Sequence, residues 1–164
     1  MLGRPTRLGH GARRPLDLGG VPGNTLIVDF DWTPHGAVTA DAHTIRFESA
    51  PRAPGLYRID LDATHTYIGE ALSLASRLNG YRNPGGSVDT LVPRTNRRVQ
   101  RKILEALAAG RSVPVWICTA ATLTAEGDTT ALPLNDKTRR LLVEAAAIIL
   151  AERGGWTLEN LHRR

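Results

Sequence analysis

The sequence has a single cysteine, few aromatic residues and no long apolar run. Cys118 stands alone among 164 residues, so no intramolecular disulfide can form and the fold does not depend on an oxidising compartment. No apolar stretch approaches the roughly 20 residues that cross a bilayer. The arginines near the start are not followed by the apolar region of a secretory signal. These absences predict a cytoplasmic protein with no membrane partner.

Lysine is also scarce, because all but two of the 21 basic residues are arginine. The net charge is +5. Residues 51–118 contain 10 basic and 5 acidic side chains, whereas the flanking segments are each balanced, so the whole excess lies in this part. Basic charge concentrated in one segment is typical of a surface that binds a polyanion, although an ordinary solvated surface gives the same charge.

The length suits one domain preceded by two shorter segments. Residues 1–24 are interrupted throughout by glycine and proline, which predicts a mobile arm. Residues 25–32 and 43–48 read as two strands, so 25–52 is predicted to be an N-terminal β extension, in the form of a hairpin. Residues 53–164 then form the main domain.

The main domain is predicted to be of the α+β class, a small three-stranded antiparallel sheet flanked by helices. Apolar periodicity and turn residues place its elements. The predicted strands are Gly55–Asp60, Thr64–Gly69 and Val113–Cys118; the predicted helices follow Gly69 and span Asn96–Ala109 and Asp136–Arg153, with residues 119–135 as a loop.

Tyr57 and Tyr67 lie on adjacent strands of the predicted hairpin. If residues 61–63 form a three-residue turn, Asp60 pairs with Thr64 and Tyr57 stands directly opposite Tyr67, with Cβ atoms about 4.5–5.5 Å apart. Such a pair is either an ordinary aromatic packing contact or two phenol groups presented to a site.

Two charged side chains stand out on the predicted helices. Arg77 borders the apolar stripe of the first helix, from where a guanidinium can reach a phosphate held over the sheet. Glu144 lies inside the apolar run 141–149, where the helix has no convincing polar face. A buried carboxylate needs a partner or a metal ion, so Glu144 is predicted to be paired or functional.

Together these residues resemble the motifs of the GIY-YIG nucleases. Gly55-Leu56-Tyr57, then nine residues, then Tyr67-Ile68-Gly69 is similar to the family's paired tripeptides. The family has an arginine on the next helix, a metal-binding glutamate on a later helix and an asparagine near the domain's end, and the matching positions are Arg77, Glu144 and Asn160. The resemblance covers about residues 53–162. It implies the GIY-YIG nuclease fold, hydrolysis of DNA phosphodiester bonds, and Mg²⁺ or Mn²⁺ as cofactor.

The resemblance also implies a role for each site residue. Glu144 holds the divalent ion, Arg77 binds the phosphate, and Asn160 orients or supports the site. Tyr57, helped by Tyr67, takes part in deprotonating the attacking water. A tyrosine with a pKa of about 10 is a poor base at neutral pH, so Arg77 and the metal ion are expected to lower that pKa.

Three positions depart from the family pattern or extend it. Glu70 stands where many members have lysine or a hydroxyl residue; we expect it to favour a helix N-terminus through the dipole, with a second metal-site carboxylate as the other interpretation. Tyr81 stands where some relatives have a histidine, so no histidine base comes from that position. His65 either lines the same face as Tyr67 or is an ordinary surface histidine.

The second predicted helix has a basic solvent face, which we expect to contact DNA phosphates through Arg94, Arg97, Arg98, Arg101 and Lys102. The alternative from another class is a DNA-binding module on this fold that does not cut. A DNA repair or recombination nuclease is a third interpretation. Because no second domain of recognisable type is attached, a stand-alone restriction or defence nuclease is favoured, and a homodimer is left open.

Overall fold

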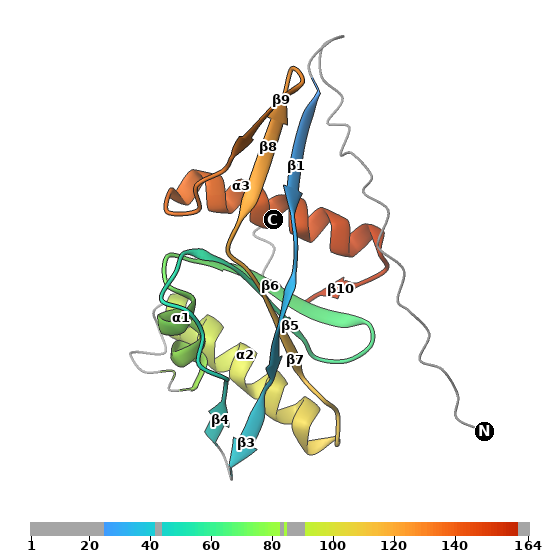
Figure 1. The fold of residues 1–164 in the computed structure, drawn as a ribbon. Coiled ribbons are helices and arrows are strands. Elements are labelled where there is room, and N and C mark those ends of the chain that lie inside the picture. Colours follow the sequence, from blue (N-terminus) through green and yellow to red (C-terminus); the bar gives the residue numbers. More distant parts are fainter. Residues whose placement is uncertain (1–24, 42–43, 83, 85–90, 161–164) are drawn as a thin grey trace, which may run out of the picture.

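The computed structural model describes residues 25–41, 44–82, 84 and 91–160 (Figure 1). The predicted arm 1–24 lies outside these residues. None of the helices in the described ranges is both long enough and apolar enough to span a bilayer. The chain is of the α+β class, with strands and helices assembled around one central sheet.

The central sheet has five strands in the order β10-β6-β5-β7-β2. The three predicted strands are its middle: β5 (Gly55–Asp60) pairs antiparallel with both β6 (His65–Ala71) and β7 (Pro114–Cys118). The sheet is larger than predicted, because β2 (Thr33–Ala37) adds antiparallel to β7 and the short β10 (Thr157–Leu158) adds parallel to β6.

Each face of the central sheet buries its own apolar cluster. Side chains alternate along a strand, so Tyr57 and Ile59 point to one side of β5 and Leu56 to the other. The first side is covered by α1 (Leu74–Arg82), α2 (Leu91–Ala108) and the hairpin of β3 (Thr39–Asp41) with β4 (Thr44–Arg46). The second side is covered by α3 (Lys137–Arg153), which crosses the sheet in Figure 1.

The N-terminal strands pair with other partners than the prediction gave them. β1 (Leu26–Phe30) pairs with β8 (Ala121–Ala125), not with residues 43–48. The segment 119–135, predicted as a loop, contains β8 and β9 (Asp128–Ala131), joined by a tight turn at Glu126-Gly127 with φ of 53° and 89°. β8 reads Ala-Thr-Leu-Thr-Ala, which alternates apolar and polar residues as a strand does, but the run is short and its apolar residues are mostly small, whereas β9 is polar and exposed. The predicted extension therefore shares its sheets with the main domain.

Two helix starts also differ from the prediction. Strand β6 continues through Ala71, so α1 begins only at Leu74. Helix α2 begins at Leu91, which places Asn96 inside the helix rather than at its cap. The end of α2 and both ends of α3 lie within one residue of the prediction. Gly110 follows α2 with φ of 73°, and the Asp136 side chain caps α3 by accepting the backbone N–H of Arg139.

Candidate active site

The β5–β6 turn sets which residues face each other, and it differs from the prediction. Asp62 Oδ1 accepts the backbone N–H groups of Thr64 and His65 at 2.8 and 2.7 Å, which holds a four-residue turn. Asp60 therefore pairs with Thr66, and Tyr57 stands opposite Gly69 rather than opposite Tyr67. Because the shift is two residues, Tyr57 and Tyr67 still share one face.

Gly69 provides the space that Tyr57 occupies. A Cβ atom at Gly69 would lie 2.3 Å from the Tyr57 hydroxyl and 2.6 Å from the ring carbon that bears it. The phenol thus lies directly over the glycine backbone. Gly55 is equally constrained, because a Cβ there would lie 2.3 Å from the carbonyl oxygen of Cys118 on β7. The glycines of both tripeptides are therefore needed for close approach.

Three tyrosines form a buried cluster between the sheet and α1. The ring centroids of Tyr57, Tyr67 and Tyr81 lie 5.9 to 6.2 Å apart. The hydroxyl groups of Tyr57 and Tyr81 share a 2.5 Å hydrogen bond, and both side chains are 0% exposed. In the sequence analysis Tyr81 is only the residue that replaces a histidine of some relatives. In the structure its hydroxyl is the closest polar partner of the Tyr57 hydroxyl.

Arg77 is held against this cluster on three sides. Its Nε donates to the Tyr57 hydroxyl at 3.0 Å, and its Nη1 donates to Oδ1 of Asn96 at 3.0 Å. The guanidinium carbon lies 4.9 Å from the centre of the Tyr81 ring. Asn96 is buried inside α2, so two helices and one strand fix the orientation of this cation.

The environment of Tyr57 contradicts the expected lowering of its pKa. Burial raises that pKa well above its ordinary value, and the neighbouring Tyr67 raises it further. Arg77 and the hydrogen bonds act in the opposite direction but are the smaller effect. Tyr57 is therefore a neutral, enclosed phenol near neutral pH, which suits a group that holds Arg77 rather than one that accepts a proton from water.

Glu144 approaches the site from α3, on the other side of the sheet. Burial raises the pKa of its carboxyl to about 7, and the negative charge of Glu70 adds to the increase. Arg77 lowers that pKa, as does a hydrogen bond that the carboxylate accepts from the backbone of Glu70. The expectation that Glu144 does not lie on a solvated stripe is confirmed, since Arg140 and Ala147 on the same helix are buried.

Glu70 lies in strand β6, not at a helix start, so the expected helix-dipole role is wrong. Its carboxylate accepts a hydrogen bond from Nε of Arg140 at 2.5 Å. Arg140 is only 5% exposed and also donates to the carbonyl oxygens of Leu134 and Asn135. This buried cation, to which the sequence analysis assigns no role, neutralises Glu70 and leaves Glu144 as the less compensated acid.

Asn160 supports the outer edge of β6 and is not in the Arg77 cluster. Its side-chain amide accepts the N–H of Ile68 at 3.0 Å and donates to the carbonyl of Ile68 at 2.5 Å. Ile68 precedes Gly69 and Glu70, so Asn160 fixes the strand that carries both. The expected supporting role thus acts through the backbone.

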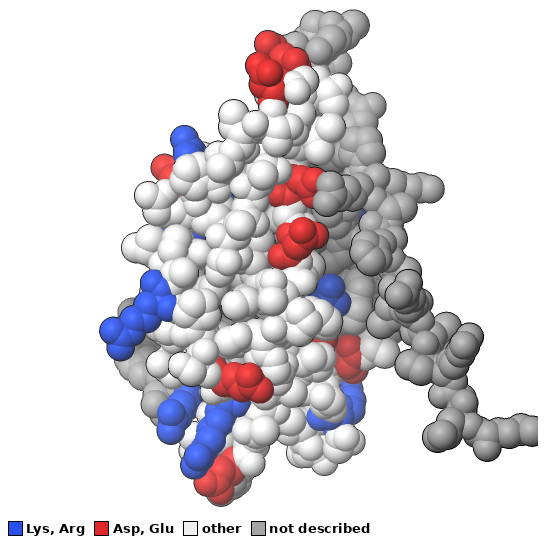
Figure 2. All heavy atoms as spheres, in the orientation of Figure 1, with Lys and Arg blue, Asp and Glu red and all other residues white. Residues whose placement is uncertain are grey.

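The predicted basic face of α2 is partly engaged within the protein. Arg94 is exposed, and Arg101 pairs loosely with Glu105 at 3.6 Å. Lys102 and Arg98 both contact Glu159, while Arg97 is half-buried. On the face shown in Figure 2, Lys and Arg are more numerous on the lower half, over the helices α1 and α2 and the β3–β4 hairpin.

His65 lies at the turn end of β6, away from the tyrosine cluster. Its Nδ1 is 3.0 Å from both carboxylate oxygens of Asp62, and its side chain is 40% exposed. The described residues hold no group of three or more histidine, cysteine, aspartate or glutamate side chains placed to bind a metal ion.

Comparison of the chain with protein-family models, with curated proteins and with solved structures finds no match. The resemblance to the GIY-YIG nucleases therefore depends on the motif residues alone. Of these, Tyr57, Tyr67 and Arg77 meet in one cluster, and Glu144 is close enough to Arg77 for the two charges to interact.

Proposed function

We propose that this chain is a metal-dependent endonuclease that hydrolyses DNA phosphodiester bonds, as its resemblance to the GIY-YIG family implies. The observation that supports it best is that Arg77 and Glu144, from opposite faces of the sheet, lie close enough for the charge of Arg77 to lower the pKa of Glu144. An oriented guanidinium that binds phosphate stands near a carboxylate whose pKa is raised to about 7. A phosphate and a divalent cation are the two ligands that such a pair would bring together.

The residues present fit a divalent ion held mainly by Glu144. Burial and the negative charge of Glu70 destabilise the ionised form of Glu144, and a cation would relieve both effects. One or two carboxylates are enough for Mg²⁺, which usually completes its coordination with water and substrate phosphate. When bound, the ion would act as a Lewis acid and lower the pKa of a coordinated water.

Arg77 would bind the scissile phosphate and stabilise the charge that develops on it. The protein has already restricted the guanidinium through Tyr57, Asn96 and Tyr81, so little side-chain entropy is lost when phosphate binds. In this arrangement Tyr57 is a positioning residue that acts through Arg77. Tyr67 packs against Tyr57 and keeps the cluster closed to solvent.

The test compares Glu144→Gln with Glu105→Gln, a matched removal of an exposed carboxylate on α2. The wild type and Glu105→Gln should nick a supercoiled plasmid with Mg²⁺ or Mn²⁺ and stop on addition of EDTA. Glu144→Gln should lose cleavage yet retain DNA binding measured in EDTA, because Arg77 and the basic face remain. DNA binding without cleavage by the wild type would instead favour the non-cleaving DNA-binding module.

The biological role we propose is restriction or defence, and a repair or recombination nuclease is the alternative. Sequencing the ends produced from methylated and unmethylated DNA panels separates the two. Fixed recognition sequences or dependence on methylation support restriction, whereas preference for branched or damaged duplexes supports repair.

A further inference from the structure

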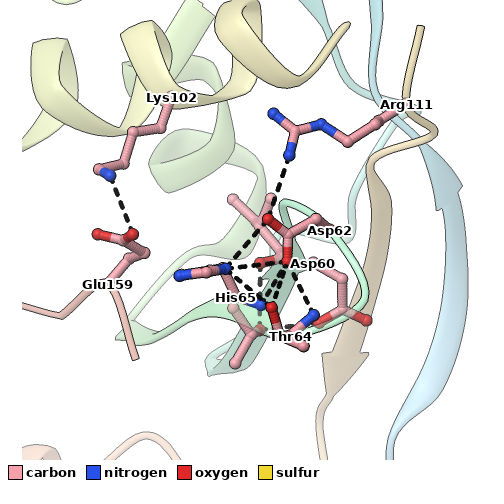
Figure 3. Close-up of polar contacts among 9 residues, drawn as sticks. Asp60, Asp62, Thr64, His65, Lys102, Arg111 and Glu159 are labelled. Atoms are coloured by element: carbon pink, nitrogen blue, oxygen red, sulfur yellow. Dashed lines mark hydrogen bonds and ion pairs between the residues drawn. The ribbon is translucent and has the colours of Figure 1, made fainter. Parts of the chain in front are cut away.

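At the C-terminal end of α2, six charged or titratable side chains converge beside the β5–β6 turn. Figure 3 shows Lys102 reaching from α2 to Glu159, with the imidazole of His65 and the guanidinium of Arg111 converging on Asp62. A pocket of about 170 Å³ opens between them and is also lined by Glu105.

Glu159 is the only acid in this group that contacts two cations of α2 in the described residues. Its carboxylate lies 2.9 Å from Nζ of Lys102 and 3.9 Å from Nη1 of Arg98. The same Arg98 nitrogen also donates to the carbonyl oxygen of Glu159 at 2.5 Å. The carboxylate thus stands where an anion bound by the predicted DNA face would stand.

Arg98 is under-satisfied in this arrangement. Its Nε and Nη2 are buried and have no hydrogen-bond partner among the described residues. Buried donors are normally paired, and unpaired ones mark a place where an acceptor belongs. A phosphate diester, like a carboxylate, has two charged oxygens and can accept two parallel hydrogen bonds from a guanidinium.

The other two acids of the cluster, Asp62 and Glu105, already have partners. Asp62 accepts a hydrogen bond from Arg111, and the hydrogen bonds from the Thr64 backbone and from His65 hold the pKa of its carboxyl well below the ordinary value. Glu105 pairs with Arg101 on the solvent side of α2. Glu159 is therefore the side chain that can swing away while its backbone N–H stays bonded to Thr66.

We infer that Lys102 and Arg98 form a subsite for a backbone phosphate of nucleic acid, and that Glu159 occupies it in the free protein as an internal competitor. The inference rests on the proposed function, because it assigns a second phosphate contact on the same substrate. Asn96, which orients Arg77, precedes Lys102 by six residues, about 9 Å along the helix axis. At 3.4 Å per nucleotide, one strand passes both groups within a few nucleotides.

The experiment measures affinity for a short fluorescein-labelled duplex in EDTA over a range of salt concentrations. Glu159→Gln should bind about three- to ten-fold more tightly at low salt and steepen the salt dependence by nearly one ion released. Asp128→Asn on exposed β9 removes the same charge far from α2 and is the control for net charge. Lys102→Gln combined with Glu159→Gln should abolish most of the gain.

A gain for Glu159→Gln no larger than that for Asp128→Asn overturns the inference, as does a gain that survives the loss of Lys102. Urea unfolding of each variant shows whether the fold is kept. Failure of the proposed function gives a different result: the wild type would bind DNA, Glu159→Gln would raise the affinity, and neither protein would cleave the DNA. No measurable binding by any variant would overturn both.

Discussion

Glu144 should make the protein less stable as the pH rises, and Glu144→Gln should remove that effect. Its pKa is 4.5 in an unfolded chain and about 7 in the folded protein. Between these values the native state binds more protons than the unfolded state, so the free energy of unfolding falls with increasing pH. The glutamine keeps an oxygen that can accept the Glu70 N–H and removes only the charge.

The magnitude follows from the difference between the two pKa values. At 1.36 kcal/mol per unit, an increase from 4.5 to about 7 is worth at most about 3.4 kcal/mol. Glu144 is partly exposed, and solvent screening reduces the figure to about 1–2 kcal/mol. Relative to the wild type, Glu144→Gln should therefore gain about 1–2 kcal/mol between about pH 5 and about pH 8.

Urea unfolding followed by tryptophan fluorescence, in EDTA, measures this difference at each pH. Glu105→Gln, exposed on α2, is the control and should follow the wild type at both pH values. Saturating Mg²⁺ should then stabilise the wild type at the higher pH, since a ligand that binds only the native state adds to its stability, and should leave Glu144→Gln unchanged. A pH-independent difference between Glu144→Gln and the wild type would refute the reasoning.

Two further substitutions test the backbone that supports the site. Gly69→Ala should destabilise the fold by about 3 kcal/mol in urea, because a methyl group 2.3 Å from the fully buried Tyr57 hydroxyl forces that ring to move; a loss under about 0.5 kcal/mol would mean that the ring moves freely. Asn160→Ala should cost about 1–3 kcal/mol through two lost hydrogen bonds to Ile68, whereas Asn135→Ala at an exposed position should be nearly neutral, and equal values for the two would contradict the assigned role of Asn160.

Apolar periodicity and turn residues were enough to place the three middle strands and the last helix. It could not give the strand register, because the register depends on how Asp62 hydrogen-bonds the turn backbone, which no periodicity encodes. It could not reveal β9, which is polar and exposed, and the alternation of β8 (Ala-Thr-Leu-Thr-Ala) spans only five residues, too few to stand out from a polar loop. The pairing of β1 with β8 joins segments nearly a hundred residues apart and has no local pattern.

A contact in the candidate site could be predicted from the sequence where both residues lie close together along the chain. Tyr81 lies four residues after Arg77 and so shares its helix face, which the sequence contains. The sequence predicts Asn96 as the first residue of its helix, whereas α2 begins five residues earlier, at Leu91, so that Asn96 lies inside the helix. The sequence gives no sign that Arg140 is buried, because its partner Glu70 lies 70 residues away along the chain.

The outer edge of β6 has a consequence for how the protein behaves when its site is altered. Along this edge the carbonyl of Thr64 accepts the N–H of Thr157 in β10, and the carbonyl of Thr66 accepts the N–H of Glu159 just after it. The Asn160 amide bonds both backbone groups of Ile68, and the Glu144 carboxylate accepts the N–H of Glu70. An uncovered strand edge is a template for pairing with another chain and for aggregation. We therefore expect truncation of Glu144 or Asn160 to free backbone groups of this edge and to favour intermolecular strand addition at the place where the chemistry is proposed.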